Sequence, residues 1–76
     1  MLRNIVYALI RPGEQSGFIA ECPELSAITQ GKTLDEVAAN LKEVVALALD
    51  GEEPASMGLG PTPTIVVTFE LEPAVA

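Results

Sequence analysis

The chain has 76 residues, and its 11 acidic residues, four basic residues and lack of histidine give a formal charge of −7. A chain of this length forms one small domain that buries only roughly 60% of its unfolded surface, so we expect it to self-associate. Without histidine, histidine-based nucleophilic catalysis and histidine-ligated metal sites are excluded. The acidic pI of about 4.2 disfavours direct binding to nucleic acid phosphates.

The single cysteine, Cys22, has no partner for an internal disulfide, and a lone thiol without histidine makes no zinc site. Because Cys22 shares a strand face with Phe18 and Ala20, we expect it to fill a small buried apolar position. The neighbouring Glu21 and Glu24 disfavour its thiolate. The N-terminal residues lack the features of a signal peptide, and no apolar run is long enough to span a membrane. We therefore expect a cytoplasmic protein that makes no membrane contact.

Two antiparallel strands are predicted at the start of the chain. Residues 4–10 are apolar on both faces and rich in strand formers, which is typical of a central strand. Residues 11–17 contain one proline and two glycines and predict a hairpin turn. The second strand, residues 18–22, ends at Pro23, which has no N–H for a ladder. Its core face is expected to carry Phe18, Ala20 and Cys22.

A short third strand over residues 27–30 is expected to stop at Gly31, and a helix follows it. The pattern Thr33-x-x-Glu36 is a capping box, in which the Thr33 hydroxyl accepts from the Glu36 N–H and the Glu36 carboxylate accepts from the Thr33 N–H. Gly51 is the expected left-handed stop of the helix. The apolar stripe at helical spacing consists of Leu34, Val37, Ala38, Leu41, Val44, Val45 and Ala48.

The rest of the chain predicts a loop, a last strand and a tail. Residues 52–63 are rich in proline and glycine and are expected to form the loop. Residues 64–72 alternate apolar and polar side chains and predict the last strand, and residues 73–76 are expected to be a flexible tail. The element order is therefore β-β-β-α-β, an α+β fold within one domain spanning residues 1–72.

The expected sheet order is 3-2-1-4, because the doubly apolar first strand suits a central position beside a parallel last strand, with one helix on one face. The opposite face is expected to carry Ile19, Val6 or Tyr7, and Val66. This face is too apolar to remain exposed to water. We therefore expect the open face or an edge strand to form a homodimer or a larger homo-oligomer.

Several motifs resemble the HicB-like antitoxin family. They are Gly17-Phe18-Ile19-Ala20-Glu21-Cys22-Pro23-Glu24-Leu25, Thr29-Gln30-Gly31, Thr33-Leu34-Asp35-Glu36-Val37 and Asn40-Leu41-Lys42-Glu43. The resemblance implies a partial RNase H-like fold and the neutralisation of a small basic HicA-like toxin that cleaves mRNA. The chain departs from the family pattern at Ser26-Ala27, where the family has Pro-Gly, at Lys32, where it has an acidic residue, and at Val37, where it has alanine.

The acidic surface is expected to face such a basic partner, because complementary charge accelerates association. The residues expected to contact it are Glu21, Pro23, Glu24, Leu25, Asp35 and Glu43. The residues expected to have a structural role are Gly31, Thr33, Glu36 and Gly51. Solubility alone is the simpler explanation of the charge.

Catalysis is not expected, since residues 4–10 contain no acidic residue where RNase H-like nucleases hold their first metal ligand. We therefore expect no enzyme activity, no metal and no cofactor. Many family members carry a C-terminal DNA-binding domain, and we expect none here. The alternative function is a solitary homo-oligomeric scaffold or small-ligand-binding module without a toxin partner, with a cleft between the helix start and residues 52–63.

Overall fold

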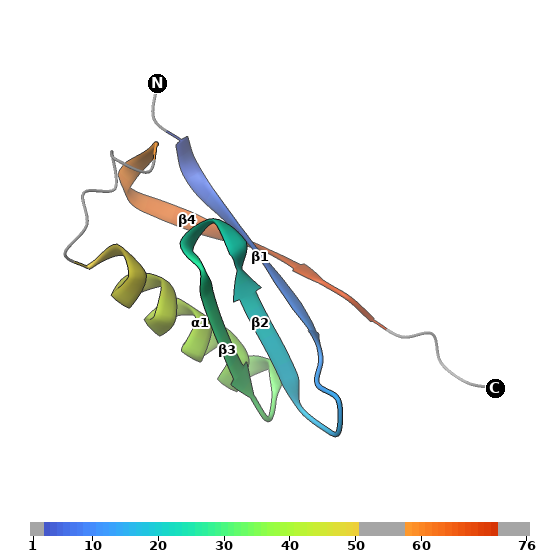
Figure 1. Ribbon diagram of the computed structural model, residues 1–76. Helices are drawn as coiled ribbons and strands as arrows, with labels where there is room; N and C mark the ends of the chain where they lie inside the picture. Colours follow the sequence, from blue (N-terminus) through green and yellow to red (C-terminus); the bar gives the residue numbers. More distant parts are fainter. Residues whose placement is uncertain (1–2, 51–57, 72–76) are drawn as a thin grey trace.

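The structure, a computed structural model, describes residues 3–50 and 58–71. Its elements follow the order β1 (Arg3–Pro12), β2 (Phe18–Cys22), η1 (Pro23–Leu25), β3 (Ala27–Gly31), α1 (Leu34–Leu49) and β4 (Leu59–Phe69), where η1 is a short 3-10 helix. The four strands form one mixed sheet in the order β3-β2-β1-β4 (Figure 1). The predicted α+β fold, element order and sheet order are confirmed.

The pairing of β1 with both neighbours makes it a central strand. It runs antiparallel to β2, with Ile10 opposite Ala20, and parallel to β4, with Tyr7 opposite Val66. β2 and β3 are also antiparallel, with Cys22 opposite Ala27. Because β4 lies parallel to β1, the chain needs a long connection between β3 and β4. α1 and the segment after it provide this connection.

The last strand begins earlier than predicted. β4 starts at Leu59, within the predicted 52–63 loop, and ends at Phe69 rather than at residue 72. Leu59 is buried and lies opposite Arg3, whereas Thr64 lies opposite Ile5, so extra β4 residues bulge out between these pairs. The prolines of residues 59–63 therefore led to the wrong prediction of a loop in part of β4. Residues 51–57 and the predicted tail lie outside the described residues.

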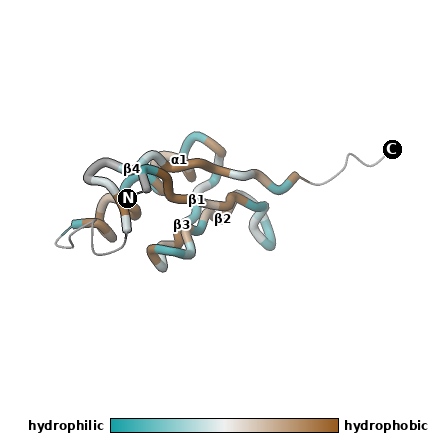
Figure 2. Tube along the Cα trace, turned by 90° about the horizontal axis from the view of Figure 1, so that it is seen from above, coloured by the Kyte–Doolittle hydropathy of each residue, from teal (hydrophilic) through white to brown (hydrophobic). Residues whose placement is uncertain are grey.

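The core lies between α1 and one face of the sheet. From the strands, the buried side chains are Val6, Ala8, Ile10, Ala20, Cys22, Ala27 and Leu59, and α1 adds Val37, Leu41 and Val45. Figure 2 shows a long hydrophobic stretch where β1 and β4 run side by side. Phe18, Ala20 and Cys22 share this face, as predicted, and Val6 belongs to the core rather than to the open face.

The helix covers only part of the sheet, because α1 lies closest to β3 and β2 (Figure 1). The side chains of Ile65 and Val67 on β4 pack against the core but stay partly exposed. Leu34, which was predicted in the buried stripe, is 41% exposed because the first turn of α1 lies at the end of the sheet. Among the described helices, none is long and apolar enough to cross a membrane.

The start of α1 has half of the predicted capping box. The Thr33 hydroxyl accepts a hydrogen bond from the Glu36 N–H at 3.0 Å, as predicted. The Glu36 carboxylate accepts from the Lys32 N–H at 3.3 Å, not from the Thr33 N–H. At the other end, the Asp50 N–H donates to the Ala46 carbonyl at 3.0 Å. Gly51, the predicted stop, lies outside the described residues.

Gly31 explains how closely β3 approaches the helix. A Cβ atom at this buried position would lie 2.5 Å from the Val37 nitrogen and 2.8 Å from the Val37 Cα atom. Real Cβ atoms do not make such contacts with backbone, so only glycine fits between β3 and the first turn of α1. The predicted structural role of Gly31 therefore has a steric cause.

Candidate partner-binding surfaces

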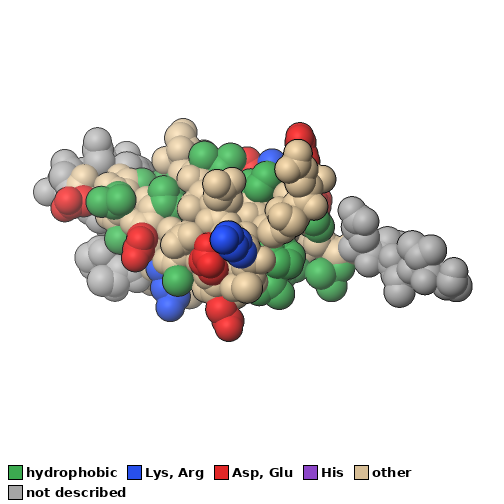
Figure 3. Space-filling model, turned by 90° about the horizontal axis from the view of Figure 1, so that it is seen from below, with side chains coloured by type: hydrophobic (Ala, Val, Ile, Leu, Met, Phe, Trp, Pro, Cys, Tyr) green, Lys and Arg blue, Asp and Glu red, His purple; other side chains and the backbone are tan. Residues whose placement is uncertain are grey.

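The residues predicted to contact a partner lie on three separate parts of the molecule. Glu21 lies on β2, Pro23, Glu24 and Leu25 form η1, and Asp35 and Glu43 lie on α1. In Figure 3 the acidic side chains are dispersed, with basic and hydrophobic side chains between them. That these six residues bind one partner stays a prediction.

Glu21 lies on the open face of the sheet and forms an ion pair with Arg11. The Arg11 Nη1 atom donates to the Glu21 Oε1 atom, and both side chains are 34% exposed. In the ladder, Glu21 lies opposite Leu9 on one side and Ile28 on the other. The carboxylate is thus paired with a cation on the same sheet face. The opposite charges on the two arms of the hairpin are compatible with this pair but do not determine it.

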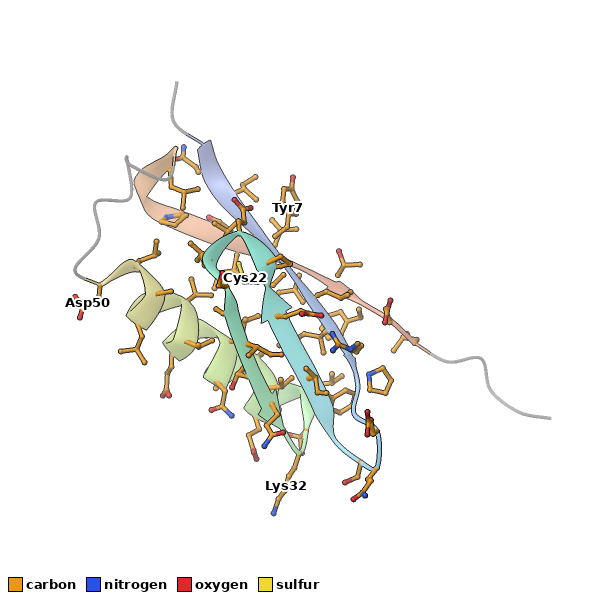
Figure 4. All side chains as sticks on the ribbon, viewed as in Figure 1. Tyr7, Cys22, Lys32 and Asp50 are labelled. Atoms are coloured by element: carbon orange, nitrogen blue, oxygen red, sulfur yellow. The ribbon has the colours of Figure 1, made fainter. Side chains whose placement is uncertain are left out.

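The η1 corner shields the Cys22 thiol. Ser26 ends η1 in a left-handed conformation with φ of 53°, and its N–H donates to the Pro23 carbonyl at 3.0 Å. Pro23 and Glu24 are exposed, whereas Leu25 packs partly against the core. Beneath them Cys22 is buried between sheet and helix (Figure 4).

The pKa of the Cys22 thiol is raised above its ordinary value. Desolvation by burial is the largest cause, a backbone hydrogen bond from Leu25 opposes it, and the Glu24 carboxylate adds to the increase. Burial and a nearby negative charge both disfavour the thiolate. Cys22 therefore has the environment of a packing residue, as the sequence indicated.

The exposed side of α1 carries the largest group of acidic side chains on any described element. Asp35, Glu36 and Glu43 are exposed along the helix and Asp50 follows its last turn, with Lys42 as the basic residue among them. Lys32 and Asp50 lie at opposite ends of α1 (Figure 4). The helix thus presents a net negative surface away from the sheet.

An open groove with a volume of about 740 Å³ lies at the start of α1. It runs between the β1–β2 turn and the end of β3, and its lining residues include Ser16, Phe18, Gln30, Lys32 and Asn40. None of the lining residues comes from residues 58–63, so the groove differs from the cleft predicted beside that segment. Asn40 is already engaged, because its side-chain amide donates to the Gln30 carbonyl at 2.8 Å.

Within residues 3–50 and 58–71, no group of three or more cysteine, aspartate or glutamate side chains is placed to hold a metal ion. The open face of the sheet instead exposes apolar side chains. Ile5, Tyr7, Ile28 and Val66 are all at least 37% exposed. The described surfaces therefore offer an acidic helix, an apolar sheet face and an edge strand for contact with other molecules.

The structure defines a small α+β domain with one helix on a four-stranded mixed sheet. The chain belongs to the UPF0150 family. It is 42% identical over 51 residues to the UPF0150 protein ssr1258 of Synechocystis sp., and the match covers 66% of this chain and 74% of that protein. No family model matches the chain, and no solved structure matches it.

Proposed function

We propose that this protein is a HicB-like, antitoxin-type binding domain that neutralises a small basic HicA-like mRNA-cleaving toxin by surface contact. Two features support the proposal. The motifs between Gly17 and Glu43 resemble those of HicB-like antitoxins. In addition, the β-β-β-α-β order and the β3-β2-β1-β4 sheet agree with the partial RNase H-like fold that this resemblance implies.

The observation that carries the proposal is the acidic outer side of α1. A protein that cleaves RNA needs basic side chains to bind phosphates, so a rigid acidic surface competes for the same side chains. α1 is fixed by its buried residues Val37, Leu41 and Val45, and it holds Asp35 and Glu43 exposed on the outside. Of the residues predicted to bind a partner, these two are the acidic pair on this surface.

The test is a calorimetric titration of this protein with a small basic HicA-like protein, which is sought among the products of adjacent genes. The double variant D35N/E43Q removes two negative charges from α1. The matched control E14Q/E70Q removes two exposed charges from the β1–β2 turn and the end of β4. Since an exposed ion pair contributes about 0.2–1 kcal/mol, we expect D35N/E43Q to weaken binding roughly 2- to 30-fold.

The control is expected to change the affinity by less than about twofold, because its charges lie away from α1. Added salt is expected to slow association with the wild-type protein, since it screens the attraction between the charges. Equal losses of affinity in both double variants would show that net charge alone is responsible. No binding by the wild-type protein would refute the proposed function.

A ligand-binding module remains the second candidate, and the groove at the start of α1 is the observation that favours it. Its volume of about 740 Å³ is within the range of small-molecule sites. A ligand at a hundredfold excess over its Kd adds about 2.7 kcal/mol to the free energy of unfolding. A thermal-shift screen of metabolites detects such a ligand, and abolition of the shift by Asn40→Ala would place it in the groove.

A further inference from the structure

The two edges of the sheet differ in how they are protected. At the β3 edge, α1 lies alongside the strand, and the Asn40 side chain donates to the Gln30 carbonyl at 2.8 Å. At the other edge, no described strand pairs with the outer side of β4. Natural sheets protect an exposed edge with charges, prolines or a covering element. From Thr64 to Phe69, β4 has none of these.

The orientation of the hydrogen-bonding groups on β4 follows from one contact. The Glu70 N–H donates to the Ile10 carbonyl at 2.9 Å, so it faces β1. Because the N–H and C=O groups of successive strand residues alternate in direction, those of Ile65, Val67 and Phe69 face the outer edge. The same alternation turns the nitrogen of Pro63 outward, which is where a strand tolerates proline.

The side chains of these three residues lie on the helix side of the sheet, where α1 leaves β4 partly uncovered. Ile65 and Val67 are partly buried, and Phe69 is 47% exposed. A strand that pairs with β4 would therefore form hydrogen bonds with the outward-facing N–H and C=O groups of these three residues. It would also cover their apolar side chains on the helix side of the sheet. β4 itself has the sequence that such an element needs.

We propose that a second copy of this chain pairs antiparallel with β4 about a two-fold axis at Val67, so that the two sheets become one. Val67 then lies opposite Val67 of the second copy, and Ile65 lies opposite its Phe69. Each of these pairs exchanges two backbone hydrogen bonds, as residues do at the closely spaced positions of an antiparallel ladder. Such an interface is isologous, because each copy contributes the same strand.

This register agrees with the other residues of β4. Val66 lies opposite Thr68 of the second copy on the open face, and Glu70 lies opposite its Thr64, so no carboxylates oppose each other. A shift of the axis to Ile65 would place Pro63 opposite Val67 and remove two hydrogen bonds. The axis at Val67 uses the outward-facing groups within the strand, and it leaves the acidic outer side of α1 accessible.

The test combines molar mass and variants. Light scattering after gel filtration is expected to give twice the chain mass of 8.0 kDa at a concentration of roughly 100 µM. Phe69→Lys places a charge in the proposed interface and is expected to give the monomer mass. The control Leu47→Lys makes the same change at a 71% exposed position on α1 and is expected to remain dimeric.

Amide hydrogen exchange tests the register without any substitution. In the dimer, the Ile65, Val67 and Phe69 amides are expected to be protected, and dilution to the monomer removes this protection. The Val66 and Thr68 amides face β1 and are expected to stay protected in both states. A wild-type monomer, a dimer that persists in Phe69→Lys, or a dimer abolished by Tyr7→Lys on the open face would each overturn the proposal.

Discussion

Thr33 fixes the start of α1, because its hydroxyl accepts a hydrogen bond from the Glu36 N–H at 3.0 Å. Thr33→Ala removes this acceptor and is expected to lower the free energy of unfolding by about 1 kcal/mol. Thr33→Ser keeps the hydroxyl and serves as the control. Chemical denaturation gives the free energy of unfolding of both variants. An equal value for Thr33→Ala and wild type would show that the cap does not stabilise the fold.

Cys22 makes the stability of the protein depend on pH. Burial raises the pKa of its thiol in the folded state, so the folded state binds more protons than the unfolded state at alkaline pH. The stability from this group is complete below the unfolded pKa of about 8.5 and is lost as the pH rises through the folded pKa. We expect the urea midpoint to fall as the pH rises above roughly 8.5.

The control for this prediction is Cys22→Ala, which lacks the titrating thiol and leaves the other titratable side chains unchanged. Its urea midpoint is expected to fall less as the pH rises. An equal fall in both proteins would contradict a raised thiol pKa. Because Cys22 is fully buried, a thiol reagent is also expected to label it only after unfolding.

The sequence predicted the roles of residues that depend on neighbours close along the chain. It did not predict contacts between residues that the fold brings together. The Thr33 cap and the inert Cys22 follow from residues within four positions along the chain. The pairing of Arg11 with Glu21 depends on the register of the β1–β2 hairpin, which sequence patterns do not determine. Glu21 was predicted to contact a partner, and the fold shows that Arg11 pairs with its carboxylate.

At the scale of elements, Gly31 sets the distance between β3 and α1. In Gly31→Ala the new Cβ would meet the Val37 backbone at 2.5 Å, and the first helical turn would have to move away. Overpacking of this kind costs typically 1–3 kcal/mol, so we expect a lower Tm. The control Gln30→Ala changes the adjacent exposed residue and is expected to have little effect. An unchanged Tm for Gly31→Ala would contradict this close approach.

The start of β4 shows where element prediction failed. Pro61 and Pro63 indicated a loop, yet both lie within Leu59–Phe69. Proline is compatible with a strand when its nitrogen faces a free edge, and β4 is an edge strand. To predict a strand instead of a loop here, one must know that β4 lies at the edge of the sheet. This position is known only from the assembled fold.

At the scale of the whole molecule, the topology was predictable and the surfaces were not. The doubly apolar pattern of β1 predicted its central position and the parallel last strand, which the structure has. Which part of the sheet α1 covers depends on packing. α1 lies near β3 and β2, and this placement divides the acidic residues among three surfaces and leaves the β4 edge uncovered.

We propose that this protein neutralises a basic RNA-cleaving protein by contact through the outer side of α1. It is tested by the growth of cells that express a small basic HicA-like protein, with and without this chain. We expect growth to stop with the basic protein alone, to recover with the wild-type chain and with E14Q/E70Q, and to recover less with D35N/E43Q. Growth arrest that persists with the wild-type chain would refute neutralisation by this protein.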